Sequence, residues 1–237
     1  MKILAIESSS LVASIALLTD DVMTAEYTVN YKKTHSQTLL PMINDIATMI
    51  DLDLKELDAI AVSGGPGSFT GLRIGSATAK GLGLALDTPL INVSTIKAMA
   101  YNFFDSDALI CPIMDARRSQ TYTGVFRNAD GDLQVVMDDC AISIEELIDF
   151  LNNQGEKVVF TGDGIPVFSE ILDDRLTVPH KYAPAGMNRQ RASSVAILGA
   201  KMFAAGNIQT SDEHVPEYLR VSQAERERAE RLGADGK

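Results

Sequence analysis

The strongest constraint on the fold is a pattern of short apolar strands that occurs twice along the chain. In each occurrence an apolar run ends at an acidic residue, Glu7 in the first and Asp115 in the second. Two further strand patterns, a helix pattern and a closing strand follow each run. The expected segments are 3–6, 13–18, 23–31, 35–50 and 57–62 in the first set and 109–115, 120–126, 133–137, 143–151 and 157–161 in the second. Strands interspersed with helices indicate an α/β protein, and the repetition indicates two similar units.

The boundary between the two units is expected near residues 105–107, where the second occurrence of the pattern begins. We therefore predict an N-terminal domain over 1–105, a C-terminal domain over 106–221 and a charged tail over 222–237. The tail is rich in Arg, Glu and Gly, which is typical of a frayed helix or a disordered segment. A helix over 192–205 is expected to close the second unit, with packing of the last segment on the first domain as the alternative.

Composition narrows the class of protein. The chain has 237 residues, of which 46% are hydrophobic, enough for a sizeable core and too many for a disordered chain. Its formal net charge of −11 argues against a protein that binds nucleic acid alone, because such proteins neutralise phosphates with Lys and Arg. Without a signal-peptide pattern or a membrane-spanning apolar stretch, we expect a cytoplasmic protein with no membrane contact. Cys111 and Cys140 lie far apart, which fits a reducing compartment and predicts neither a disulfide framework nor a zinc site.

A glycine-rich loop follows the strand at 57–62 and precedes a helix at 72–86. Backbone N–H groups of such a loop can point at an anion, so Gly65 and Gly67 are candidate phosphate-binding positions. No Lys-Ser or Lys-Thr pair follows the loop, and Thr70 stands where a dinucleotide fingerprint has its third glycine. A tight connection with positive φ angles is the alternative, and the loop alone does not decide between the two.

Three acidic residues are the candidate chemical groups. Glu7 and Asp115 end apolar strands, and Asp163 lies between two glycines. Acids in such places can hold Mg²⁺ through water beside a phosphate, and they can equally form turns, which is the interpretation we favour for Asp163. The histidines are scattered, with no Gly-x-Ser-x-Gly motif and no pair of His or Cys at ligand spacing. We therefore predict no catalytic residue and no metal ligand.

Two N-terminal helices carry features that their own domain does not fully explain. The helix at 35–50 has apolar residues over more than one face, so it needs cover on two sides. The helix at 72–86 has Gly75, Ala79 and Gly83 at four-residue spacing, and each glycine inside a helix costs roughly 1 kcal/mol relative to alanine. Close approach of a neighbouring element explains such glycines, and that element belongs either to the same chain or to a partner.

Motifs along nearly the whole chain resemble those of one family. The central motif is Ser-Gly-Gly-Pro-Gly-Ser-Phe-Thr-Gly-Leu-Arg-Ile-Gly at 63–75, and further matching segments lie at 35–41, 79–82, 114–117, 162–164 and 216–220. Together they resemble the TsaB (YeaZ) family. Glu7 is a departure, since the family more often has Asp at this position. The resemblance implies an actin/sugar-kinase/Hsp70-like (ASKHA) fold with two ribonuclease-H-like lobes.

The resemblance also implies a function in making threonylcarbamoyladenosine, the modified base beside the tRNA anticodon. In that pathway a TsaB-like protein is the non-catalytic companion of a catalytic paralogue, TsaD, and of an ATPase, TsaE. The paralogue has an H-x-x-x-H metal pair, whose two histidines correspond to Thr95 and Met99 here. We therefore expect a partner subunit that is not an enzyme and that meets tRNA only through the complex. It is expected to hold no cofactor tightly and to bind ATP or ADP weakly at most.

In the resembling family the two N-terminal helices pack against the equivalent helices of the paralogue. We predict an interface centred on Leu39, Ile43, Ile46, Leu72, Gly75, Ala79 and Gly83. The sequence does not decide which row of each helix faces outward. Because such a surface is self-complementary, a homodimer is expected when the paralogue is absent.

A second candidate region is a cleft for a nucleotide or phosphate, formed by Glu7, Ser8, Gly65, Gly67, Asp115 and Asp163. It supports the alternative functions, a stand-alone glycoprotease-like peptidase or an ATP-dependent phosphotransferase of the same fold.

Overall fold

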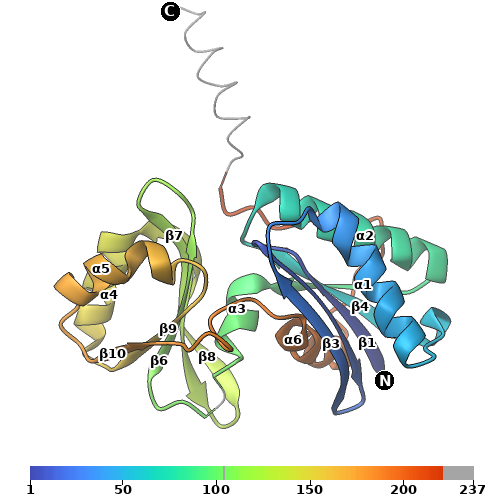
Figure 1. Ribbon diagram of the computed structural model, residues 1–237. Coiled ribbons are helices and arrows are strands. Elements are labelled where there is room, and N and C mark those ends of the chain that lie inside the picture. Colours follow the sequence, from blue (N-terminus) through green and yellow to red (C-terminus); the bar gives the residue numbers. More distant parts are fainter. Residues whose placement is uncertain (104, 221–237) are drawn as a thin grey trace, which may run out of the picture.

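The computed structural model of the protein describes residues 1–103 and 105–220, which form two lobes side by side (Figure 1). Each lobe is an α/β unit built on its own sheet, as the sequence predicts. The chain passes from the first lobe to the second after the short helix α3 (Thr95–Ala100). The tail predicted over 222–237 lies outside the described residues. No helix within the described part of the chain is long and apolar enough to cross a membrane.

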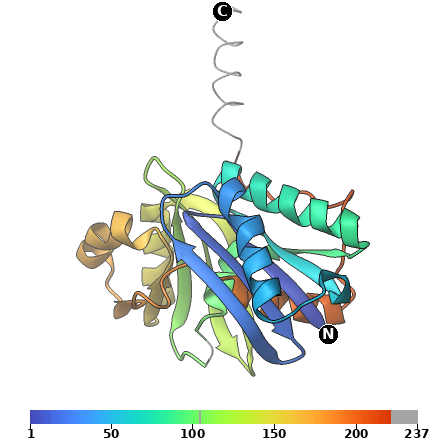
Figure 2. The ribbon, with the colours of Figure 1, turned by 45° about the vertical axis from the view of Figure 1, so that its right-hand side comes forward.

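Within the described residues, the sheet of the first lobe has five strands in the order β3-β2-β1-β4-β5. Their bounds are β1 (Lys2–Glu7), β2 (Val12–Thr19), β3 (Val22–Asn30), β4 (Ala59–Gly65) and β5 (Leu90–Ser94). β1, β2 and β3 form an antiparallel meander, whereas β1, β4 and β5 run parallel. The apolar runs of β1 and β4 are buried on both faces and lie at the centre, while β3 lies at the margin and is half-buried or exposed (Figure 2).

The second lobe repeats this arrangement with its own strands. The order of its described strands is β10-β9-β6-β7-β8. Their bounds are β6 (Leu109–Asp115), β7 (Gln120–Ala129), β8 (Asp132–Ser143), β9 (Val158–Thr161) and β10 (His180–Tyr182). β6, β7 and β8 are again antiparallel, and β6, β9 and β10 are again parallel. The matching topology confirms the duplicated unit predicted from the repeated strand pattern.

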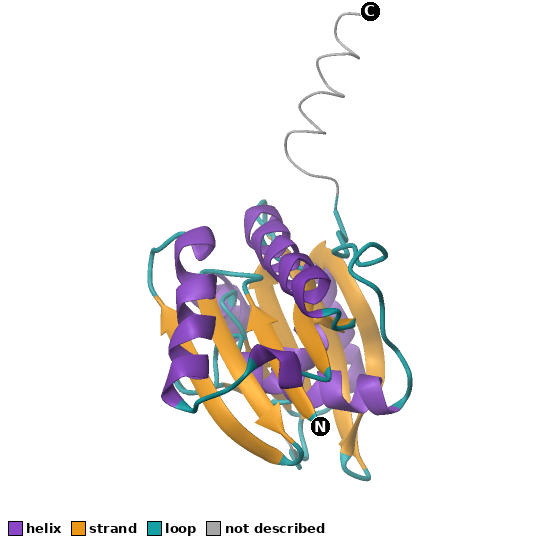
Figure 3. Ribbon diagram, turned by 90° about the vertical axis from the view of Figure 1, so that its right-hand side faces the viewer, coloured by secondary structure: helices purple, strands orange, loops and turns teal. Residues whose placement is uncertain are grey.

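Helices cover the faces of the two sheets (Figure 3). The remaining helices are α1 (His35–Met49), a 3₁₀ turn η1 (Leu54–Glu56), α2 (Phe69–Leu86), α4 (Ile144–Gln154), α5 (Ile165–Arg175) and α6 (Ala192–Ala204). α1 and α2 enclose one core with the inward residues of β1, β2 and β4, and α4 and α5 enclose the core of the second lobe. Each core is formed by apolar residues that a strand or an amphipathic helix turns to the same side.

The helix expected to close the second unit packs instead on the first lobe, which was the alternative considered for this segment. Ala192 and Val195 of α6 are fully buried against the face of the first sheet opposite α1 and α2. Small residues allow this close approach: a Cβ built on Gly199 lies 2.6 Å from the Cβ of Ala61. The first sheet therefore lies between two helical layers, and the chain returns to the first lobe after completing the second.

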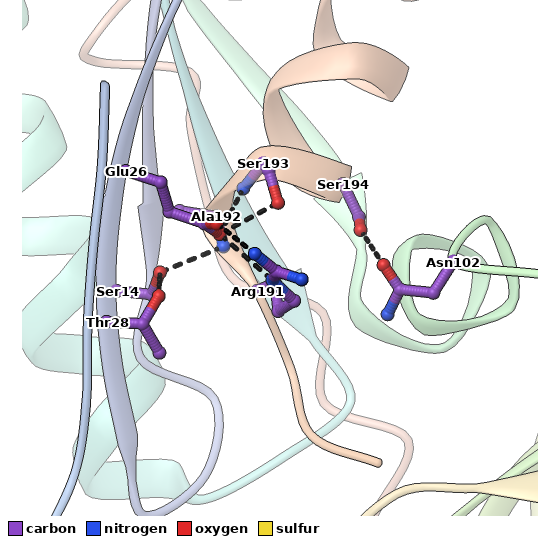
Figure 4. Close-up of polar contacts among 8 residues, drawn as sticks. All are labelled: Ser14, Glu26, Thr28, Asn102, Arg191, Ala192, Ser193 and Ser194. Carbon is purple, nitrogen blue, oxygen red and sulfur yellow. Dashed lines mark hydrogen bonds and ion pairs between the residues drawn. The ribbon is translucent and has the colours of Figure 1, made fainter. Parts of the chain in front are cut away.

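A polar network fastens the start of α6 to β2 and β3 (Figure 4). The Glu26 carboxylate accepts hydrogen bonds from the backbone N–H of Ser193 at 3.2 Å, the Ser193 hydroxyl at 2.7 Å and the Arg191 guanidinium. The Ala192 N–H donates to the Ser14 hydroxyl at 3.1 Å. Burial by itself raises the pKa of Glu26, but the bonds from Arg191 and Ser193 outweigh it, so the pKa lies below its ordinary value. Glu26 thus supplies the cap of α6.

Candidate functional site

The carboxyl ends of the central strands of both lobes meet at a cleft. Its cavity measures about 520 Å³ and is bounded by the loops after β1 and β6, the first turn of α2 and the segment that ends at residue 220. The polar and charged residues that line it are Ser9, Ser10, Ser68, Asp115, Arg117, Arg118, Tyr122, Asp163 and Arg220. Ligands of α/β proteins bind beyond the carboxyl ends of strands, so this cleft is the candidate small-molecule site.

Glu7 lies beneath the cleft, at the end of β1. The residue is 1% exposed, and its carboxyl accepts hydrogen bonds from the backbone N–H and the hydroxyl of Ser9, each at 2.6 Å. Burial raises the pKa of Glu7, and the nearby Asp163 adds to the rise. The sequence groups Glu7 with the cleft residues, but the structure places it below the wall that Ser9 forms. Its direct contacts are with Ser9 in the loop after β1 and with the side chain of Ser63 at the end of β4.

Asp115 and Asp163 line the cleft from the second lobe. Asp115 accepts a hydrogen bond from the backbone N–H of Arg117 at 2.8 Å and pairs with its guanidinium at 3.1 Å. Asp163 lies in the turn between β9 and α5, as expected, and burial raises its pKa. Gln190 donates to Asp163 at 3.3 Å and accepts from the Ser10 hydroxyl at 2.9 Å, so it links the two lobes across the cleft.

The glycine loop makes room for other segments of the same chain. Gly65 has a φ of 124°, and a Cβ on it lies 2.2 Å from the carbonyl oxygen of Glu217. A Cβ on Gly67 lies 2.3 Å from the carbonyl oxygen of Ser9, and this oxygen accepts a hydrogen bond from the Ser68 N–H at 2.7 Å. Packing within the chain therefore requires both glycines, whether or not an anion binds beside them.

Arginines at the mouth of the cleft are the group that sequence reasoning missed. Arg117, Arg118 and Ser119 have positive φ angles of 67°, 57° and 56° in succession. Successive non-glycine residues in the left-handed region carry backbone strain, which concentrates at functional sites. Arg220 reaches the cleft from the C-terminal segment and donates to the carbonyl oxygen of Ala116. The only sequence signal for Arg117 and Arg220 is their position inside the family motifs.

The residues predicted at a partner interface face the interior of the first lobe. The five predicted residues that are not glycine are at most 6% exposed, and the two glycines are buried as well. These residues are Leu39, Ile43, Ile46, Leu72, Gly75, Ala79 and Gly83. The prediction selected the wrong row of each helix, because the apolar row that resembles a contact surface is the row that covers the lobe's own sheet.

The buried glycines of α2 are also explained within the chain. A Cβ on Gly75 lies 2.2 Å from the hydroxyl of Ser8, and a Cβ on Gly83 lies 2.5 Å from the hydroxyl of Ser211. The close neighbours are therefore the loop after β1 and the C-terminal segment. By contrast, a Cβ on Gly81 has no atom within 4 Å.

A different set of residues faces solvent on the two helices, and we call it the outer helix face. Leu40 and Leu84 are 54% and 65% exposed. Pro41, Ala77 and Gly81 are exposed as well. These five residues are apolar or small and lie among exposed polar residues such as Gln37, Asn44 and Arg73. The small ones allow the backbone of another helix to come close.

Thr95 and Met99, the two positions for which the family resemblance implies histidines in the paralogue, lie in the core next to the second lobe. Thr95 is 0% exposed and Met99 is 1% exposed, and Met99 belongs to the same apolar cluster as Ile110 and Tyr122 of the other lobe. Among the described residues, no group of three or more His, Cys, Asp or Glu side chains could hold a metal ion. At these two positions the chain thus has residues that pack the lobes together.

Two lobes of this matching topology, each with an acid at the end of its first strand and a cleft between them, define the ASKHA fold class. The structure of YeaZ from Pseudomonas aeruginosa superposes with a TM-score of 0.77 at 24% identity, covering 92% of this chain and 99% of that chain. A second Pseudomonas aeruginosa structure, described as an uncharacterized protein with similarity to peptidase YeaZ, gives a TM-score of 0.78. The (R)-2-hydroxyglutaryl-CoA dehydratase component A of Acidaminococcus fermentans shares the fold at a TM-score of 0.50 and 13% identity, covering 86% of this chain.

Sequence comparison identifies the family within this class. The family model described as "TsaD: tRNA N6-adenosine threonylcarbamoyltransferase" matches residues 23–228. The tRNA threonylcarbamoyladenosine biosynthesis protein TsaB of Bacillus subtilis is 36% identical over 95% of this chain and 96% of its own length. The protein of the same name from Escherichia coli is 28% identical over 93% of this chain and 95% of its own length. The chain belongs to the TsaB family.

Proposed function

We propose that this chain is a non-catalytic partner subunit in the synthesis of threonylcarbamoyladenosine in tRNA. In this function it binds and activates a TsaD-like catalytic paralogue and recruits a TsaE-like ATPase in the cytoplasm. The observation that carries the proposal is the outer helix face, where apolar and small residues from two long helices stay exposed although the lobe already has a filled core.

The outer helix face suits a helical partner. Leu40 and Leu84 offer side chains that lose contact with water only when another surface covers them. Ala77 and Gly81 stand four residues apart on α2, and the space around Gly81 is open. A partner helix can therefore lie close along this row. Because two copies can also bring these rows together, the same surface supports a homodimer in the absence of the paralogue.

The buried positions in α3 support a non-catalytic role. The resemblance implies that the corresponding positions of the paralogue hold a metal, whereas here Thr95 and Met99 are buried and Met99 belongs to an apolar cluster between the lobes. The net charge of −11 further supports contact with tRNA through the complex, because this chain alone repels a polyanion.

Reconstitution with a TsaD-like paralogue, a TsaE-like ATPase and tRNA tests the proposal directly. Threonylcarbamoyladenosine formation is expected to depend on this chain. Leu40→Asp and Ala77→Arg are expected to weaken capture of the paralogue in a pull-down at least tenfold and to lower modification in parallel. Variants of Ile43 or Ala79 are poor probes, because these residues are buried and their replacement unfolds the lobe.

Val135→Asp is the matched control, since Val135 is 42% exposed on β8 of the second lobe. It is expected to leave both capture and modification unchanged. Full capture of the paralogue by Leu40→Asp and Ala77→Arg would contradict the assigned surface, and modification that proceeds equally well without this chain would contradict the proposed function.

The arginine-bearing cleft supports a second, weaker candidate, the binding of a nucleotide or another phosphate compound. Arg117, Arg118 and Arg220 line a cavity large enough for a small ligand, and Asp115 and Asp163 lie beside them. Calorimetry with ATP and ADP, on this chain alone and with the paralogue, tests it. We expect weak binding at most for the chain alone.

The same cleft is where a phosphotransferase or peptidase would act, so the purified chain should also be assayed for ATP and peptide hydrolysis. Turnover that Asp115→Asn or Asp163→Asn abolishes would replace the partner-subunit proposal with an enzyme of the same fold. No turnover is expected.

A further inference from the structure

β3 is an edge strand whose outer side is unpaired in the described part of the chain. Its hydrogen-bonded neighbour in the first sheet is β2. β3 is nine residues long and contains no Lys, Arg or Pro. Its one charged residue, Glu26, turns toward α6 and pairs with Arg191. Soluble proteins ordinarily protect edge strands with charges, prolines or short length. The free backbone N–H and C=O groups of β3 are therefore suited to pairing with another strand.

An apolar groove lies beside β3 on the face that α1 covers. It measures about 730 Å³, and its apolar walls are Ala25 and Tyr27 from β3 and Ile46, Met49 and Ile50 from α1. Tyr27 is 41% exposed and Met49 is 82% exposed. Alternate side chains of a strand added to β3 would point into this groove. The occupant must therefore be an extended segment with apolar residues at alternate positions, as β3 itself is.

The two ends of β3 carry opposite charges. Asp20 and Asp21 precede the strand, and Lys32 and Lys33 follow it. All four are exposed, and the described residues form no ion pair with Asp21, Lys32 or Lys33. In an antiparallel pair of identical strands, the acidic end of each copy lies against the basic end of the other. This complementarity favours a second copy of the chain as the occupant.

We propose that β3 pairs with β3 of a second copy in antiparallel orientation, so that the first-lobe sheets of the two copies become continuous. Asp21 then faces Lys32 of the second copy, and Val22 faces Tyr31, which are 65% and 67% exposed in the single chain. Tyr27 lies at the two-fold axis, opposite Tyr27 of the second copy.

The β-bulge in β3 makes this register consistent along the whole strand. The pairing of β3 with β2 shifts by one residue between Met23 and Ala25. With this shift, pairing of Val22 with Tyr31 at the ends brings Ala25 opposite Val29 near the centre. Ala25 and Val29 both pack toward the core under α1. Residues opposite each other in an antiparallel pair share a face, so the two constraints agree.

The strand-paired dimer differs from the helix-paired dimer of the proposed function and leaves the outer helix face free. Sedimentation of the full chain without partners distinguishes them. Asp21→Lys and Lys32→Asp are each expected to weaken dimerisation roughly tenfold, because each creates two like-charge contacts across the two-fold axis. The double variant is expected to restore it, and Tyr27→Lys to abolish it.

Ala77→Arg is the control for the helix surface and is expected to leave the strand-paired dimer intact. Circular dichroism verifies that each variant stays folded. A wild-type chain that remains monomeric at about 100 μM would overturn the proposal. A dimer that Ala77→Arg disrupts and Tyr27→Lys does not would also overturn it, and so would a double charge reversal that dimerises less than either single one.

Disulfide trapping tests the register independently. The Cys140→Ser background leaves Cys111 as the remaining native cysteine, and Cys111 is fully buried. In this background Tyr27→Cys is expected to form a disulfide with the same introduced cysteine of the second copy under mild oxidation, because opposite Cα atoms in a strand pair lie within disulfide range. Val22→Cys and Tyr31→Cys are expected to cross-link only when the two variants are mixed. Self-cross-linking of Val22→Cys in place of Tyr27→Cys would refute the register.

Discussion

Replacing Glu26 with Gln is expected to loosen α6 from the first lobe. The side chain is 14% exposed and accepts hydrogen bonds from Arg191 and from both the backbone and the hydroxyl of Ser193. Gln keeps the shape of the side chain but removes the charge, and its NH₂ group faces donors where an acceptor is needed. With its oxygen at the Oε1 position, the Gln side chain still accepts from both donors of Ser193, but its NH₂ group then faces the Nη2 donor of Arg191, which loses its acceptor together with the opposing charge.

The size of the effect follows from these contacts. A hydrogen bond to a charged group contributes about 1.5–3 kcal/mol net, and loss of one partner from a fully buried ion pair costs about 3–5 kcal/mol. The Arg191 side chain is 41% exposed and is partly solvated by water in the variant, so we expect a loss of about 2–3 kcal/mol in the free energy of unfolding. For a chain of this length, that corresponds to a decrease in Tm of roughly 5–10 °C.

Thermal unfolding followed by circular dichroism and calorimetry from pH 3.5 to 8 tests the prediction. The folded pKa of Glu26 is below its unfolded value, so the stability it contributes is complete above the unfolded pKa of about 4.3 and is lost as the pH falls through the folded pKa. The difference between the wild type and Glu26→Gln should therefore stay constant from pH 6 to 8 and shrink below about pH 4.3.

Glu170→Gln on the exposed side of α5 is the matched control and should not change the Tm. A change of less than about 2 °C for Glu26→Gln at pH 7, or a difference that persists unchanged in acid, would refute the reasoning.

Other outcomes are expected from local packing and from charge. Gly71→Ala should destabilise the first lobe by about 1–3 kcal/mol, because its Cβ would lie 2.1 Å from the carbonyl oxygen of Ser8. Gly81→Ala should instead stabilise α2 by up to about 1 kcal/mol, because a Cβ there has no atom within 4 Å. Thermal unfolding measures both changes. Burial raises the pKa of the Cys111 thiol to about 12, so at pH 8 a thiol reagent should label Cys111 only after unfolding, and early labelling would indicate an opened second lobe. The chain alone should not shift tRNA in a gel at physiological salt, while the reconstituted complex should.

The sequence predicts the elements whose pattern is locally complete. β1 and β6 are found as predicted because continuous apolar runs ending in an acid have few other interpretations. α4 begins directly after Ser143 because Ser143 is its N-cap and forms a capping box with Glu146. α5 was missed, since its helical pattern follows directly on the Gly162–Gly164 turn and contains Pro166 at its start.

The candidate site was less predictable because it depends on contacts between distant segments. The row of α2 that contains Gly75 was assigned to a partner, because its close neighbour, Ser8, is more than 60 positions away in sequence and no local pattern joins them. Arg117 and Arg220 likewise come together only after both lobes have formed. Glu7 and Asp115 could be selected from the sequence because each ends a strand. The burial of Glu7 below the cleft could not be predicted from the sequence.

The return of the chain to its first lobe has a consequence for synthesis on the ribosome. The strands of the first sheet are complete at Ser94, but the helix that covers its second face begins roughly 100 residues later, at Ala192. At about 5–20 residues per second, the nascent chain exposes Ile3, Ala16 and their neighbours for on the order of 5–20 s. During that interval the half-finished lobe is a natural client for a chaperone that shields apolar sheet surface, and a truncated chain ending before α6 should aggregate.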